Sequence, residues 1–98
     1  QTYYNTTSDA RLKENIVDAG NALSRVGAIQ VRAFDWKESG VHQDFGFIAQ
    51  ELIEVAPEAV SEGETVDDMW GVDPSKLVPV LVKAIQELHA EIEALKNP

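Results

Sequence analysis

The sequence predicts a small α+β domain in which an antiparallel hairpin and short helices precede one long helix. Two observations predict this class. Segments 29–36 and 45–48 are rich in β-branched and aromatic residues, and a Ser39-Gly40 turn lies between them. The last quarter of the chain instead spaces its apolar residues three and four apart, as a helix does. The 98 residues are enough for one such domain and too few for two.

Composition and charge exclude several classes of protein. Eight Lys and Arg against 17 Asp and Glu give a net charge of −9. We therefore expect neither a nucleic-acid nor a membrane partner, because phosphates and anionic lipids both attract basic surfaces. The absence of cysteine excludes disulfides, thiolate catalysis and zinc–thiolate sites. No apolar run approaches the roughly 20 residues of a membrane-spanning helix.

A boundary is predicted at Ser8. Residues 1–7 hold two Tyr, three Thr and no charge, which is β-prone material with nothing to bury by itself. The charged run SDARLKEN begins abruptly at residue 8. We therefore expect 1–7 to be the end of a preceding β-rich part and 8–98 to be the domain proper.

The middle of the chain divides into short elements. Asn21 is expected to cap a helix that Gly27 stops, and Pro57 is expected to end the next helix. The strand settings of the aromatic residues Trp36, Phe45, Phe47 and Trp70 favour core positions for all four. The expected elements are a helix over 21–26, strands over 29–36 and 45–48, a helix over 49–56, an acidic loop over 61–68 and a strand over 69–72.

The long helix is the clearest element. Asp73 is a good N-cap, Pro74 suits the first helical position, and Pro79 should kink the helix or separate its first turn. Spacing alone leaves open whether its apolar face covers the domain's own core or forms a coiled coil between identical chains. That face has the heptad pattern, with β-branched residues at a and leucine at d: Val78, Leu81, Ile85, Leu88, Ile92 and Leu95.

Few residues indicate a metal or cofactor, and we expect none. The acidic residues of the loop over 61–68 do not fit the EF-hand spacing. His42 and His89 are 47 residues apart and match no metal signature. His89 is expected on the outer face of the long helix, and His42 in the hairpin loop, where its role stays open.

Ser8 and Lys13 lie five residues apart at the predicted boundary. A serine hydroxyl becomes a nucleophile when a nearby base takes its proton, and a neutral lysine amine can be that base. Spacing alone is weak support, because serine and lysine occur together in most surface segments. The plain alternative is that Ser8 caps the turn that follows it.

Four segments in order then resemble one known family. They are SDARLKENI at 8–16, FDWK at 34–37, GFIAQE at 46–51, and VDPSKLVPVLV at 72–82 with AIQEL at 84–88. Together they resemble the intramolecular chaperone domain of phage tailspikes and tail fibres, the endosialidase type classed as peptidase family S74. Related domains also occur in membrane-bound eukaryotic transcription factors. The acidic, cysteine-free composition of this chain favours a phage fibre over that group.

The resemblance implies a homotrimeric folding device. Such domains bring three chains of an upstream β-rich shaft in the same polypeptide into register, and then cut the bond before the motif serine. Here that is the Thr7–Ser8 bond, with Ser8 as the nucleophile and Lys13 as the general base. The resemblance also assigns the six apolar heptad residues to a trimeric coiled coil. It implies a precursor of a phage virion tail protein, acting in the host bacterial cytoplasm during assembly.

Two other functions stay open at this point. A structural trimerisation cap that never cuts would need the heptad residues but neither Ser8 nor Lys13. A receptor-binding tip would need an exposed patch built from the aromatic residues, which their strand settings disfavour.

Overall fold

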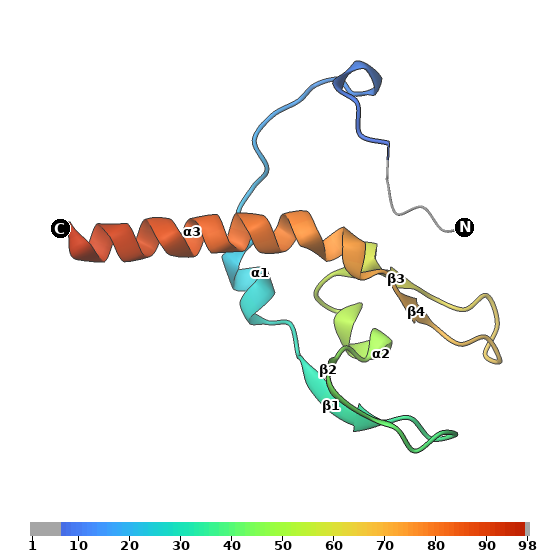
Figure 1. Ribbon diagram of the computed structural model, residues 1–98. Helices are drawn as coiled ribbons and strands as arrows, with labels where there is room; N and C mark the ends of the chain where they lie inside the picture. The colour runs from blue at the N-terminus through green and yellow to red at the C-terminus, as the bar shows by residue number, and fades with distance from the viewer. Residues whose placement is uncertain (1–6, 98) are drawn as a thin grey trace.

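The computed structural model describes residues 7–97, so the predicted upstream segment lies outside the described residues except for Thr7 (Figure 1). The α+β class is confirmed. The helices are α1 (Leu23–Gly27), α2 (Ala49–Leu52) and α3 (Val78–Lys96), and the strands are β1 (Arg32–Asp35), β2 (His42–Gly46), β3 (Val60–Ser61) and β4 (Gly71–Val72). Single 3₁₀ turns occur at Ala10–Leu12, Pro57–Ala59 and Pro74–Leu77.

Helix α3 is the longest element, and the other elements are best described by the side of α3 on which they lie. The hairpin β1–β2, the short helix α2 and the pair β3–β4 lie on one side of it (Figure 1). The N-terminal segment leaves α3 on the opposite side, as the blue trace shows (Figure 1). The chain therefore has a body on one side of α3 and an extended segment on the other.

The hairpin contains a β-bulge that changes which residues point outward. Arg32 lies opposite Gly46, but Phe34 lies opposite Gln43, so β2 has one residue more than β1 between these two pairs. An extra residue of this kind breaks the alternation of faces along a strand. Phe45 lies at this bulge and is 80% exposed.

The expectation that all four aromatic residues lie in the core is therefore wrong for three of them, and Phe47 is the one that packs against the core. Phe45 is turned outward at the bulge, and Trp36, one residue beyond the end of β1, is 54% exposed. Phe47 and Trp70 are half-buried. The turn after Trp36 is closed by Gly40, whose φ of 74° suits glycine and whose N–H donates to the Trp36 carbonyl at 2.8 Å.

A small core joins α2 to the start of α3. It consists of Leu52, Ala56, Ala59 and Leu77, with Ile29, Phe47, Val60 and Val72 packed around it. Pairing of β3 with β4 places Val60 opposite Val72, and the Asp73 N–H donates to the Ala59 carbonyl at 2.8 Å. These contacts fix the point from which α3 projects.

The start of α3 confirms the predicted effect of its two prolines. Asp73 caps the 3₁₀ turn by accepting the Ser75 N–H at 3.1 Å, and Pro74 begins that turn. The 3₁₀ turn ends at Leu77 and α3 begins at Val78, so Pro79 lies in the first turn of α3. A proline there removes an N–H that would have no helical partner anyway. The first turn of the expected long helix is thus separate, as Pro79 predicted.

Helix α1 is capped from α3 and not by Asn21, so the predicted cap is wrong. The N–H groups of Ala22 and Leu23 both donate to Glu87 Oε2, at 2.7 and 2.8 Å. A carboxylate at this position also interacts favourably with the positive end of the helix dipole. The cap lies 65 residues away in the sequence, which is why local sequence signals missed it.

Gly46→Ala tests the packing of the hairpin. A Cβ at this position would lie 2.6 Å from Gln43 Nε2 and 2.7 Å from Phe34 Cε2, both inside normal contact distance. We expect the free energy of unfolding to fall by about 1–3 kcal/mol in urea denaturation, because the Phe34 ring must move. Gly71→Ala is the matched control, since no atom lies within 4 Å of its added Cβ. Equal effects of the two substitutions would contradict the account.

Candidate functional site

Local backbone structure brings the two ends of segment 8–13 together. Asp9 caps the 3₁₀ turn Ala10–Leu12, its Oδ1 accepting the Arg11 N–H at 2.9 Å. The Leu12 N–H then donates to the Asp9 carbonyl at 3.0 Å, and the Lys13 N–H to the Ala10 carbonyl at 3.1 Å. The chain thus makes one tight turn between Ser8 and Lys13.

The turn places the two side chains in direct contact. Lys13 Nζ donates a hydrogen bond to Ser8 Oγ at 2.5 Å, and both residues are exposed. Thr7, which precedes Ser8 and carries the carbonyl of the predicted scissile bond, is also exposed. The structure therefore brings together the serine and the lysine that the sequence pairs, while their roles in catalysis stay a prediction.

Arg11 points its charge at Asp9 and not at Lys13. Its Nε lies 3.1 Å from Asp9 Oδ1 and its second terminal nitrogen lies 2.8 Å from Asp9 Oδ2. These hydrogen bonds hold the pKa of Asp9 below its ordinary value. The Arg11 guanidinium is thus paired with the Asp9 carboxylate.

The segment that carries this contact is wholly exposed. Every residue from 7 to 20, here called the strap, is exposed, and its three large apolar side chains Leu12, Ile16 and Val17 are 73%, 71% and 85% exposed. Asn15 has a φ of 56°, a left-handed conformation that asparagine tolerates, and it turns the chain after Lys13. The residue type of Asn15 is the one sequence signal for this conformation.

The six heptad residues of α3, here called the seam, form a second exposed surface. They are 39% to 82% exposed: Val78, Leu81, Ile85, Leu88, Ile92 and Leu95. Helix α3 contacts its own chain through a different stripe, formed by Val80, Lys83, Ala84 and Glu87. Of the two interpretations left open by the spacing, packing of the seam on the chain's own core is therefore wrong for the described residues.

Lys83 and Glu87 lie outside the seam, where the heptad pattern predicts solvent-exposed residues, and this prediction is wrong for both. Each is half-buried on the face that packs against α1. Glu87 also caps α1, just after the strap, so it holds the strap's point of attachment on α3. The heptad pattern identifies one apolar face of a helix and says nothing about a second, partly polar one.

The two histidines lie apart in the described structure. His42 is the first residue of β2 and pairs with Asp35, so the expectation that it lies in the hairpin loop is wrong. Its Nδ1 lies 2.6 Å from Asp35 Oδ1 and its Nε2 3.0 Å from Asp44 Oδ1. His89 is exposed on α3. Between residues 7 and 97, no group of three or more His, Asp or Glu residues could hold a metal ion. In the same range, no helix has both the length and the apolar character needed to cross a bilayer.

Comparison with known proteins relates the chain to phage fibres. The Peptidase S74 family model, described as "Chaperone of endosialidase", matches residues 8–61. The long tail fiber protein Gp37 of Enterobacteria phage M1 is 39% identical over 99 residues, which cover 93% of this chain and 39% of that protein. Gp37 of phage Ox2 has the same identity and coverage, and Gp37 of phage K3 is 31% identical over 96 residues, 8% of its length. The chain thus spans well under half of each relative.

Glu87→Ala tests the attachment of the strap's end to α3. Removing the carboxylate leaves the N–H groups of Ala22 and Leu23 without their acceptor, so we expect a loss of about 0.5–2 kcal/mol in urea denaturation. Glu87→Gln keeps an acceptor oxygen and should lose less. Gln86→Ala, at the exposed neighbouring position, is the control. The interpretation fails if Glu87→Ala is no less stable than Gln86→Ala.

Proposed function

Because the chain belongs to the chaperone-of-endosialidase family, we propose that it is a self-cleaving folding device of a phage tail fibre. In this proposal three copies associate through the seam and register a β-rich fibre part of the same polypeptide. Each copy then cuts its own chain between Thr7 and Ser8, which separates residues 1–7 from the domain over 8–98. The observation that carries the proposal is the 2.5 Å contact between Lys13 Nζ and Ser8 Oγ, at the first residue of the family match.

The exposed seam supports association of identical chains. A row of large apolar side chains along one helix is costly to leave in water, and parallel copies of α3 would bury it by packing the rows together. β-branched residues at a and leucine at d favour two strands when a coil acts alone. A seam of about two and a half heptads attached to a larger interface does not set the number of chains alone, so we follow the family and propose three.

A helical module of this kind is suited to starting the assembly of a β-rich fibre. Strands that pair between different chains form slowly, because their contacts are far apart in sequence or lie on separate molecules. Three chains joined at one module are held at high effective concentration with their ends aligned. The named relatives are long tail fiber proteins that extend well beyond the matched region, which supports a fibre part in the same polypeptide.

The proposed cleavage is an acyl transfer within the chain. Ser8 Oγ attacks the Thr7 carbonyl carbon while Lys13 Nζ takes the hydroxyl proton. The Thr7–Ser8 C–N bond then breaks, and Lys13 returns the proton to the departing Ser8 nitrogen. The resulting ester between the Thr7 acyl group and Ser8 Oγ is hydrolysed by water. The products are a Thr7 carboxylate and a chain that begins with Ser8.

The proposal also gives the order of events. Lys13 can accept a proton only as a neutral amine, and removal from water is the effect that favours this form of a lysine. In the single chain Lys13 is exposed, so this effect is missing there. Association of chains would supply it, and cleavage would follow assembly. Once the module has left, the finished fibre lacks its nucleus for reassembly and is trapped kinetically.

A structural cap that never cuts is the second candidate function. It is favoured by the exposure of both Ser8 and Lys13, a setting shared by many inert surface pairs. The two functions share the seam and differ only in whether the Thr7–Ser8 bond is cut.

Intact mass distinguishes the two functions. We expect wild-type protein to yield a product that begins at Ser8, and Ser8→Ala and Lys13→Ala to lower the rate by at least about 100-fold through loss of nucleophile and base. Lys37→Ala, an exposed lysine in the hairpin turn, should cut like wild type. An uncut wild-type trimer would leave the structural cap as the function. Cutting in Lys13→Ala but not in Ser8→Ala would assign the base to another group.

A further inference from the structure

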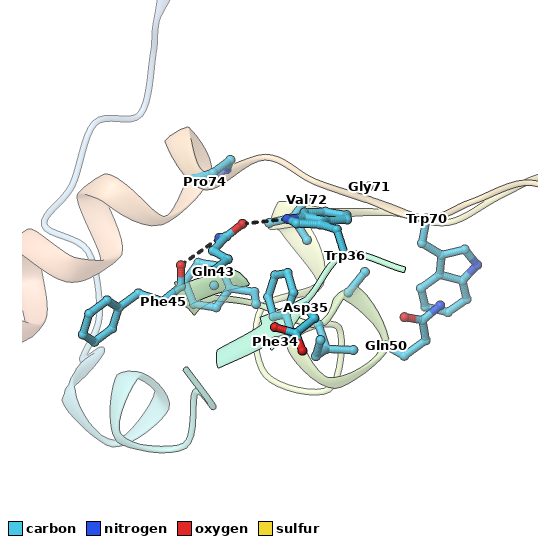
Figure 2. A pocket seen from close by; sticks show the side chains of 14 residues that line it. Phe34, Asp35, Trp36, Gln43, Phe45, Gln50, Trp70, Gly71, Val72 and Pro74 are labelled. Atoms are coloured by element: carbon cyan, nitrogen blue, oxygen red, sulfur yellow. Dashed lines mark hydrogen bonds between the residues drawn. The ribbon is translucent and has the colours of Figure 1, made fainter. Parts of the chain in front are cut away.

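A groove with aromatic walls lies between the hairpin and β4 (Figure 2). Its volume is about 730 Å³, and its lining includes Phe34, Trp36, Phe45, Trp70 and Val72. The rings of Phe34 and Trp36 meet edge to face with their centroids 5.3 Å apart. Two of its aromatic side chains lie outside the core, since Trp36 and Phe45 remain 54% and 80% exposed.

Two polar side chains beside the aromatic walls, those of Trp36 and Gln43, have partners within the chain. Trp36 Nε1 donates to Gln43 Oε1 at 3.2 Å, and Gln43 Nε2 donates to the Phe45 carbonyl at 2.8 Å (Figure 2). Gln43 therefore satisfies both its own amide and the indole N–H. What the groove offers an occupant is mainly apolar and aromatic surface, which fits aliphatic side chains.

The strap carries aliphatic side chains that are not buried on their own chain. Leu12, Ile16 and Val17 are all more than 70% exposed. The strap leaves α3 on the side opposite the hairpin, so it runs away from its own groove (Figure 1). Each chain thus carries an unfilled apolar groove and an unburied apolar segment on opposite sides of the helix proposed to join the chains.

We infer that the strap of one chain docks in the aromatic groove of the next chain in the trimer. The inference rests on the proposed function, because it requires association through α3. Two different surfaces that fit each other make a heterologous contact, and such contacts close into a ring when the rotation between chains is 120°. Three straps then fill three grooves, and no apolar segment is left over.

The extent of the seam supports a second interface. About two and a half heptads are fewer than the three to four that define a coiled coil securely. The core of a single chain is also small, with four residues in its buried cluster. A domain this short gains stability by burying surface between chains. The strap and the groove provide large apolar areas that the seam leaves uncovered.

Docking of the strap also bears on the proposed cleavage. Leu12 is the residue before Lys13, so burying Leu12 on a neighbouring chain brings Lys13 out of bulk water. That removal favours the neutral amine which the proposed reaction needs. The neighbour's groove is then the surface that removes Lys13 from water, although none of the groove's side chains takes part in the reaction.

Cysteine cross-linking tests the contact directly, because the chain has no cysteine of its own. Val17→Cys places a thiol of similar size on the strap, and Gln50→Cys places one on the exposed rim of the groove without changing its aromatic walls. The two variants are made in a Ser8→Ala background, so that the strap stays intact. They carry different tags, are co-expressed and are treated with a short bis-maleimide. We expect a cross-linked dimer that carries both tags.

The control replaces the groove cysteine by Val66→Cys, which is 99% exposed in the loop between β3 and β4. The strap–groove pair should cross-link at least ten times more than this control pair, with sedimentation of the same samples showing trimers. Trimers whose strap–groove pair cross-links no more than the control would overturn the inference and leave the proposed function standing. Monomers would overturn both. Cross-linking confined to one chain, in a protein with both cysteines, would show that the strap folds back on its own groove and would also overturn the inference.

Discussion

The structure depends on two different faces of α3, one packed against the chain's own α1 and one exposed. One stripe of the helix, centred on Ala84 and Glu87, holds the chain's own α1. The seam on another face is left in water along nearly the whole helix. An apolar helix face left in water costs free energy, and covering it with another surface would recover that free energy. This exposed face connects the fold of the single chain to its proposed assembly.

The proposed site follows from the same division. A carboxylate of α3 caps α1 just after the strap, so the strap is attached to the helix through which we propose that the chains associate. The local turn brings Lys13 to Ser8 without help from other elements, yet leaves both in water. The geometry of the proposed reacting pair is thus a local property of the chain, and the proposal assigns the removal of its water to assembly. In this account the bond is cut when three chains have met.

The sequence predicted features that depend on neighbours in the chain. The capped start at Asp73, the separation of a first turn by Pro79 and the hairpin about Ser39-Gly40 are local signals, and the structure contains all three. The contact between Ser8 and Lys13 also forms across a single turn.

Features that depend on tertiary contacts were not predictable. The cap of α1 comes from Glu87, which a heptad pattern assigns to solvent, and the outward position of Phe45 comes from a bulge that alternation does not reveal. The most direct test of the account is therefore the mass of the chain in solution by sedimentation equilibrium. The account predicts three times the mass of one chain for wild type and for Gln86→Asp, and the mass of one chain for Leu88→Asp, which puts a charge into the seam. A wild-type protein with the mass of one chain, or a trimer that survives Leu88→Asp unchanged, would contradict it.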